Sequence, residues 1–265
     1  MVNRQAELSD LLHVLRLPTI AEVFSEWALL AAKDKLTHEA FLYQLVSAEL
    51  EGRTHRRTER LRKLSGLPGD KTFATLGLGR FDPAVRSNVE RLKSGAFLDD
   101  ATNIVAVGKP GCGKTHLACA IGHTLVEQGH TVLFTSTYQL VQDLLAAKRD
   151  LRLPKAMEKL GKFDCLILDD IGYVQQDRDE MEVLFTLLAE RYERQSVIIT
   201  TNLVFSEWNK IFKDPMTTLA AIDRVVHHSV ILDLMMVESY RAEAASKQKK
   251  RGANAKAEAQ PKAVG

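Results

Sequence analysis

The stretch Gly108-Lys109-Pro110-Gly111-Cys112-Gly113-Lys114-Thr115 decides the fold of this 265-residue chain. It fits the phosphate-loop pattern GxxxxGK[ST] at every fixed position. The apolar run at 104–107 precedes it and a helix-like stretch at 116–126 follows it, which is the strand and helix context that the pattern requires. A glycine-rich turn could match by chance, but this context favours a nucleoside triphosphate site in an α/β fold.

The residue types of this loop suit phosphate binding. Glycines allow turns in which consecutive N–H groups converge on phosphates at the positive end of the following helix. Lys114 is predicted to reach the β and γ phosphates, and the Thr115 hydroxyl to hold Mg²⁺, which prefers oxygen ligands. The predicted nucleotide-binding residues are Gly108, Pro110, Gly111, Cys112, Gly113, Lys114, Thr115 and His116.

Two later strands end in polar residues. The apolar run at 165–168 ends in Asp169 and Asp170, and ligands bind at the carboxyl ends of strands in open α/β sheets. Asp169 is predicted to hold Mg²⁺, and Asp170 to polarise the attacking water. Asn202 follows the run at 197–201 and would either orient that water or only cap its strand. The helical spacing of apolar residues at 179–194 supplies the crossover between the two strands.

Several segments together resemble the IstB-type transposition helper ATPases, which belong to the AAA+ class and are related to DnaC-type helicase loaders and DnaA-like initiators. The segments are 108–118, 169–173, 191–194, 205–208, 221–228 and 238–241. The resemblance runs from the first residues to about Arg241. It implies an AAA+ P-loop parallel sheet flanked by helices, with a small N-terminal helical domain. It also implies ATP and Mg²⁺ as cofactors, slow ATP hydrolysis that depends on assembly, and a homo-oligomer on duplex DNA that serves the transposase or integrase of the same mobile element.

The resemblance adds Arg224 to the predicted catalytic residues Lys114, Asp169, Asp170 and Asn202. At the matching position of AAA+ proteins, an arginine reaches the γ-phosphate bound by the neighbouring subunit, so that hydrolysis depends on assembly. The alternative is a surface ion pair of Arg224.

Two features depart from the AAA+ pattern. Asp170 stands where many AAA+ proteins have glutamate, and its shorter side chain predicts slow hydrolysis. Little chain follows Arg224, so we expect little or no C-terminal lid, with Arg241 only a weak candidate for a lid arginine that contacts the nucleotide.

The expected organisation is a helical N-terminal domain at 1–67, an ATPase domain at 68–242 and a basic disordered tail at 243–265. Helical spacing of apolar residues and a Gly-Leu-Pro-Gly linker at 66–69 set the first boundary. Residues 73–81 should run extended onto the ATPase core, and the adenine pocket is expected around 97–100. The N-terminal helices either bind DNA or a partner, or are a packing cap on the core.

The distribution of charge is more informative than the net charge of +2. Basic residues gather near the end of the N-terminal helical region, and a cationic helix of this kind can follow DNA phosphates with strongly salt-dependent affinity. The alternative is a solvated helix face. The candidate DNA contacts are Arg53, Arg56, Arg57, Arg60 and Lys63.

Composition limits the remaining function classes. No run approaches the roughly 20 apolar residues that span a bilayer, so we expect a cytoplasmic protein with no membrane partner. The three cysteines have no metal-binding spacing, and His227-His228 has no third ligand at metal spacing in the sequence, so the pair is interpreted as structural. Two functions stay open: a DNA-remodelling ATPase that activates a transposase, and a DnaC-like replicative helicase loader.

Overall fold

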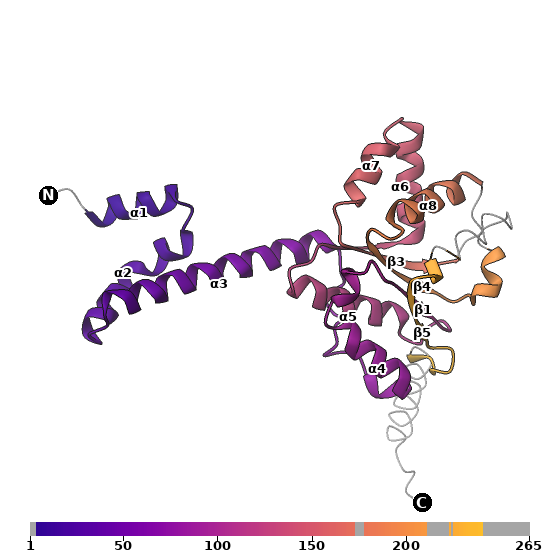
Figure 1. Ribbon diagram of the computed structural model, residues 1–265, viewed down its shortest axis with the longest axis horizontal. Coiled ribbons are helices and arrows are strands. Elements are labelled where there is room, and N and C mark those ends of the chain that lie inside the picture. Colours follow the sequence, from indigo (N-terminus) through magenta and orange to yellow (C-terminus); the bar gives the residue numbers. More distant parts are fainter. Residues whose placement is uncertain (1–3, 173–177, 211–222, 224, 241–265) are drawn as a thin grey trace, which may run out of the picture. The chain divides into compact units, whose positions relative to one another are not determined.

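The computed structural model describes residues 4–172, 178–210, 223 and 225–240 (Figure 1). The predicted tail at 243–265 and two predicted arginines, Arg224 and Arg241, lie outside these residues. The chain forms two compact units, Met1–Arg60 and Leu61–Gly265, and each is described here by itself. In the described residues, we find no helix that combines the length and the apolar character needed to cross a membrane.

The first unit is helical. It contains α1 (Arg4–Val14), α2 (Pro18–Lys33) and the first part of α3 (His38–Ser65). Pro18 opens α2, where its fixed φ and missing N–H cost nothing. Leu12, Ile20 and Leu45 form the buried core, against which apolar side chains such as Trp27 pack.

A buried carboxylate ties α2 to α3 in this unit. Glu49 is 4% exposed and accepts hydrogen bonds from the N–H groups of Thr19 (2.8 Å) and Ile20 (3.2 Å) at the start of α2. The guanidinium groups of Arg53 and Arg56 each lie 3.0 Å from Glu49 Oε1. Burial alone would raise the pKa of Glu49, but the hydrogen bond from Arg53, the backbone N–H groups and the charge of Arg56 outweigh it and hold this pKa below its ordinary value.

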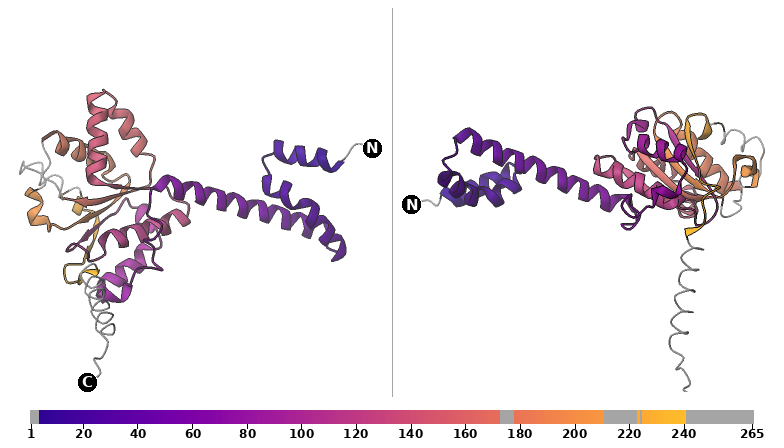
Figure 2. Two further views of the ribbon diagram at one scale, coloured as in Figure 1. Left: turned by 180° about the vertical axis from the view of Figure 1, so that it is seen from behind. Right: turned by 90° about the horizontal axis from the view of Figure 1, so that it is seen from below.

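The second unit is built on a five-stranded sheet in which every adjacent pair is parallel (Figure 2). The strand order is β2-β3-β4-β1-β5. The strands are β1 (Asn103–Val107), β2 (Val132–Ser136), β3 (Cys165–Ile171), β4 (Ser196–Thr201) and β5 (Ser229–Asp233). Strands β1, β3 and β4 are almost wholly buried, as their continuous apolar runs predict for a parallel sheet covered on both faces.

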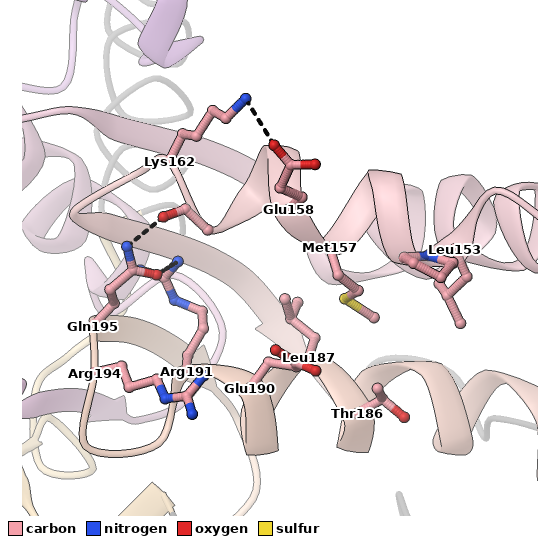
Figure 3. Close-up of a pocket in the computed structure, with 12 residues that line it drawn as sticks. Leu153, Met157, Glu158, Lys162, Thr186, Leu187, Glu190, Arg191, Arg194 and Gln195 are labelled. Carbon is pink, nitrogen blue, oxygen red and sulfur yellow. Dashed lines mark hydrogen bonds and ion pairs between the residues drawn. The ribbon is translucent and has the colours of Figure 1, made fainter.

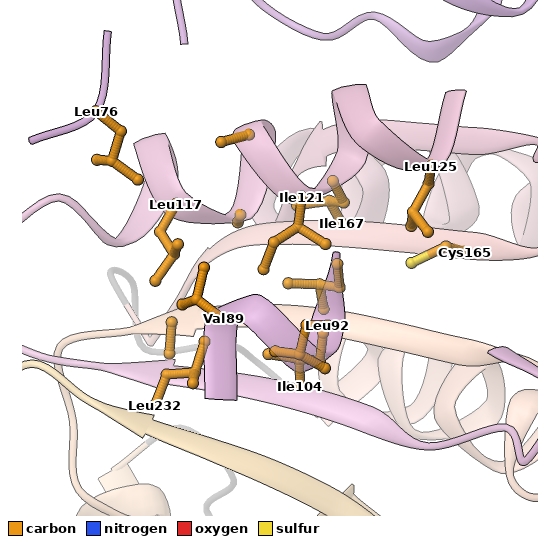
Figure 4. Close-up of a cluster of buried hydrophobic side chains, with 14 of the residues drawn as sticks. Leu76, Val89, Leu92, Ile104, Leu117, Ile121, Leu125, Cys165, Ile167 and Leu232 are labelled. Atoms are coloured by element: carbon orange, nitrogen blue, oxygen red, sulfur yellow. The ribbon is translucent and has the colours of Figure 1, made fainter. Parts of the chain in front are cut away.

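Helices cover both faces of this sheet. Alternate residues of β1 divide between two cores: Ile104 packs with α4 and α5, and Val105 packs with α6, α7 and α8. Figure 4 shows the first core, in which Val89 of α4 and Leu117 of α5 lie over the strands. The helices are α4 (Pro83–Leu92), α5 (Lys114–Glu127), α6 (Thr137–Arg149), α7 (Leu153–Leu160) and α8 (Arg178–Arg191), with 3-10 turns at Leu78–Arg80, Ala96–Leu98 and Phe205–Lys210. The expected α/β fold with helices on both faces of a parallel sheet is confirmed.

The segment before α4 differs from its expected extended form. Residues 72–76 form turns, and Leu78–Arg80 is a 3-10 turn. The Thr75 hydroxyl explains the turns, because it accepts from the N–H of Thr72 (3.2 Å) and donates to the carbonyl of Asp70 (2.6 Å). Such local side-chain bonds compete with extended structure.

Candidate nucleotide site

The phosphate loop joins β1 to α5 and depends on its glycines. Gly111 has φ +82° and Gly113, the N-cap of α5, has φ +103°, and residues with a side chain rarely adopt this conformation. At Gly108 a Cβ would lie 2.6 Å from Cys112 Sγ and 3.0 Å from the carbonyl oxygen of Leu234. The loop therefore brings its backbone to the positive end of α5 without side chains in the way, as an anion site requires.

Lys114 lies inside the loop. Its residue is 8% exposed, and its Nζ donates to the carbonyl oxygens of Gly108 (2.7 Å) and Lys109 (3.1 Å). These bonds fix the ammonium group at the mouth of the loop, where a phosphate oxygen could take their place.

A hydrogen-bonded network joins the loop to β3 and β4. Asp169 Oδ1 accepts from the hydroxyls of Thr115 (2.8 Å) and Thr200 (2.7 Å). The N–H of Asp170 donates to the same Thr200 hydroxyl at 2.8 Å. The Thr200 hydroxyl thus donates to the Asp169 carboxylate and accepts from the Asp170 backbone.

Asp170 has an unusual backbone. Its φ is +62°, a left-handed value that is uncommon outside glycine, and the pairing of β3 with β4 shifts register between Leu168 and Ile171. The side chain of Asp170 is exposed, while that of Asp169 is half-buried. Backbone strain of this kind concentrates at functional sites, because the surrounding structure must stabilise it.

Asn202 directly follows β4, whose Thr201 pairs with Ile171 at the end of β3. The residue is half-buried, and its Oδ1 is buried with no hydrogen-bond partner among the residues that the structure describes. Most buried polar atoms are paired, so this oxygen is available to a ligand or a water molecule.

A pocket of about 340 Å³ opens beside the phosphate loop. The predicted residues Gly111 to Thr115, His116 and Asp169 line it together. Its other wall is formed by Lys71, Thr75, Leu76, Gly77, Arg80, Phe81 and Tyr240. Phe97 and Asp100, where the sequence predicts the adenine pocket, line a different pocket beside α4.

Several contacts hold this second wall against the loop. His116 Nε2 lies 3.0 Å from the carbonyl oxygen of Thr72 and 3.1 Å from Thr75 Oγ1. The N–H of Tyr240 donates to the carbonyl of Gly111 at 2.9 Å, and the Arg80 guanidinium lies 4.0 Å from the centre of the Tyr240 ring. Sequence reasoning missed this wall because turns and a distant tyrosine carry no nucleotide motif.

The cysteines form no disulfide bond. Cys112, Cys119 and Cys165 are buried free thiols, and burial raises the pKa of Cys119 and Cys165 to about 12. Neutral buried thiols are unreactive.

The candidate DNA contacts on α3 fall into two groups. Arg53 and Arg56 bind Glu49, and they also donate to the carbonyl of Arg16 (2.7 Å) and the hydroxyl of Thr19 (2.9 Å). Arg57, Arg60 and Lys63 form the second group. All five residues are exposed, so the groups differ in the contacts of Arg53 and Arg56 with Glu49 and the start of α2, not in exposure.

A larger pocket of about 740 Å³ lies between α7 and α8, away from the phosphate loop (Figure 3). Beside it lies Arg191, which is 2% exposed. Its guanidinium donates to four backbone carbonyls at 2.9–3.3 Å and to Gln195 Oε1 at 2.9 Å; the carbonyls belong to Leu160, Phe163, Asp164 and Ser196. Burial lowers the pKa of this guanidinium to about 10. Arg191 therefore ties the ends of α7 and α8 to the starts of β3 and β4.

Comparison with known proteins identifies the family. Residues 10–249 match the family of IstB-like ATP binding proteins. An insertion sequence ATP-binding protein of Sinorhizobium fredii is 44% identical over 247 residues, covering 93% of this chain and 83% of the relative. The insertion sequence IS21 ATP-binding protein of Pseudomonas aeruginosa is 39% identical over 212 residues, covering 80% and 79%.

Solved structures support the AAA+ fold. AMPPCP-bound DnaA from Aquifex aeolicus has a TM-score of 0.55 at 17% identity, covering 71% of this chain and 57% of DnaA. DnaI has a TM-score of 0.54 at 16% identity, covering 64% and 95%. At these identities the likeness concerns the fold, whereas the family match spans most of the sequence: the chain belongs to the IstB-like family of ATP-binding proteins.

Proposed function

We propose that this chain is an ATP-dependent DNA-binding helper of a transposase, which oligomerises on duplex DNA, hydrolyses ATP and promotes DNA transposition in the cytoplasm. The observation that carries the proposal is the network in which Asp169 Oδ1 accepts from both Thr115 and Thr200 beside the phosphate loop. It supports an ATP site that can hydrolyse as well as bind. Relatives named as insertion sequence ATP-binding proteins support the transposition context.

The residues present fit Mg²⁺. The Thr115 hydroxyl and the Asp169 carboxylate are oxygen donors that already lie 2.8 Å apart, and Mg²⁺ binds through one or two such groups, phosphate oxygens and water. We propose these two residues as its protein ligands. When bound, the ion would neutralise charge on the β and γ phosphates.

The protein side chains have separate roles in the proposed hydrolysis. Lys114 would exchange its carbonyl partners for the β and γ phosphates, and Asp170 would polarise the attacking water. The Oδ1 of Asn202, which has no hydrogen-bond partner within the described part of the chain, would orient that water. Arg224 would act on the nucleotide of a neighbouring subunit, which makes turnover depend on assembly.

For DNA, we propose the exposed residues Arg57, Arg60 and Lys63 of α3. Arg53 and Arg56, also predicted as contacts, hold Glu49, so their replacement would disturb the first unit as well as any DNA surface. The proposed module for DNA or partner binding is the N-terminal domain at 1–67, followed by the ATPase domain at 68–242 and the tail at 243–265.

Binding of a fluorescent ATP analogue and release of phosphate test the nucleotide site. Lys114→Ala should abolish binding, while Asp170→Asn should keep binding and block turnover. Lys109→Ala is the matched control, because Lys109 belongs to the same loop but its side chain is exposed. Unchanged affinity in Lys114→Ala would disprove the assignment.

Affinity for matched duplex and single-stranded DNA, across a salt series with and without ATP, tests the second part. Duplex binding should require ATP, and Arg57→Ala/Arg60→Ala/Lys63→Ala should reduce the salt slope by about 0.9 for each DNA phosphate that these side chains neutralise. The matched control replaces three exposed lysines at α7, Lys155, Lys159 and Lys162. Preference for single strands without ATP-dependent assembly on duplex would favour the helicase-loader alternative.

A further inference from the structure

We infer that Glu193, His227 and His228 form a binding site for a divalent transition-metal ion of the zinc type. One ligand atom from each of these residues lies within 4.8 Å of the other two. The two histidines are adjacent in the sequence, but the carboxylate comes from the turn after α8, 34 positions earlier. The fold supplies the third ligand that the sequence spacing lacked.

The distances are close to those of a metal site. Zinc bonds of 2.0–2.2 Å in a tetrahedron place neighbouring ligand atoms about 3.3 Å apart. His228 Nε2 and Glu193 Oε1 lie 3.5 Å apart. Both side chains are about half exposed, at 48% and 58%, so small rotations can bring the three ligand atoms to a common centre.

The donor set selects the class of metal. Two imidazoles and one carboxylate suit zinc and similar transition ions, whereas Mg²⁺ and Ca²⁺ prefer oxygen ligands. Three protein ligands leave one tetrahedral position for water or another ligand. This site is chemically distinct from the oxygen donors Thr115 and Asp169 proposed for Mg²⁺.

The backbone that carries the histidines is anchored. The carbonyl of His228 accepts from the N–H of Asn103 at 2.7 Å, and the carbonyl of Val225 accepts from the Asn103 side chain at 3.4 Å. Val225 itself is 2% exposed and packs in the second core. The backbone positions of the two histidines are therefore set by β1 and by the core.

The other side of the site is also held in place. Glu193 has φ +55°, a left-handed conformation that is uncommon for a residue with a side chain. Its neighbour Tyr192 places its hydroxyl 3.2 Å from His227 Nδ1, which restricts the orientation of that ring. Groups that orient a histidine ligand in this way strengthen metal sites.

Bound metal would join two parts of the second unit. It would connect the turn after α8 to the turn before β5.

Titration of the full-length, untagged protein with Zn²⁺ tests the inference. A chromophoric chelator competes for the Zn²⁺, and the buffer contains excess Mg²⁺ and no nucleotide. One equivalent should bind despite the Mg²⁺. His228→Ala and Glu193→Gln should each raise the Kd more than about 10-fold. The matched control is His130→Ala, because His130 faces a single carboxylate, that of Asp164, at 3.9 Å and should leave zinc binding unchanged.

Two further measurements make the outcomes decisive. Co²⁺ should give the visible absorption bands of a tetrahedral site in the wild type and not in His228→Ala. Circular dichroism and binding of an ATP analogue in zinc-free buffer that contains Mg²⁺ should match the wild type in every variant, which separates loss of the metal from loss of the fold. The inference is wrong if the wild type takes up no zinc, or if correctly folded His228→Ala and Glu193→Gln retain it.

Discussion

Replacement of Arg191 by methionine tests how much one buried cation contributes to the second unit. Methionine keeps much of the length of the side chain but donates no hydrogen bonds. The substitution removes five hydrogen bonds, four of them to backbone carbonyls at the end of α7 and at the starts of β3 and β4.

The magnitude follows from two opposing effects. Hydrogen bonds from a charged donor contribute about 1.5 kcal/mol each at the low end, hence roughly 7 kcal/mol for five. Part of this is offset by the cost of burying the guanidinium, which also lowers the pKa of Arg191. We therefore expect Arg191→Met to lower the free energy of unfolding of this unit by about 4 kcal/mol, since each of the four carbonyls left without this donor costs about 1 kcal/mol at the low end.

Tryptophan fluorescence can report on this unit alone. The chain has two tryptophans, Trp27 in the first unit and the fully buried Trp208 in the second. In a Trp27→Phe background, urea unfolding followed by Trp208 should show the loss, and the midpoint of thermal unfolding should fall by about 10 °C. Arg194→Met is the matched control, since Arg194 lines the same pocket but is exposed. A loss below about 1 kcal/mol in Arg191→Met would refute the reasoning.

Three further outcomes are expected. Thr200→Val keeps the shape of the side chain but removes its hydrogen bonds to Asp169 and Asp170. Phosphate release should slow at least about 10-fold, which corresponds to the loss of one charge-assisted hydrogen bond, while the affinity for an ATP analogue should change little. Unchanged turnover would contradict the role of the network. Because the pKa of Glu49 is lowered in the fold, its carboxylate stabilises the first unit above the unfolded pKa near 4.5, and this stabilisation is lost as the pH falls below that value. Glu49→Gln should therefore weaken the dependence of Trp27 fluorescence on acid pH. A pH profile identical to that of the wild type would rule this out. Arg224→Ala should bind ATP and hydrolyse it poorly. Mixing it with Lys114→Ala, which keeps Arg224, should partly restore phosphate release. If mixtures that co-assemble show no restoration, a site shared between subunits is excluded.

Local motifs predicted the sheet and the phosphate-loop side of the site. The strand, loop and helix around Gly108 to Thr115 have short-range causes, namely apolar runs, glycine turns and helical spacing, and all are visible in the sequence. Asp169 could be placed near Thr115 because parallel strands end at the same edge of a sheet.

Contacts between distant segments could not be predicted in the same way. Thr200 looks like one of several β-branched residues of a buried strand, and only the register of β3 with β4 shows that its hydroxyl meets Asp169. Arg53 and Arg56 look like solvated cations until the fold brings Glu49 and the start of α2 to them. The turns at 72–76 depend on one hydroxyl, that of Thr75, which no periodicity reveals.

The phosphate loop and the start of α5 are contacted by two segments that lie near opposite ends of the described part of the second unit. His116 meets residues 72 and 75, shortly after α3, and Gly111 meets Tyr240, the last residue that the structure describes. A phosphate that displaces the loop would therefore shift or break its bonds with both segments. One bound nucleotide would thus act at the same time on two segments of the second unit that are far apart in the sequence.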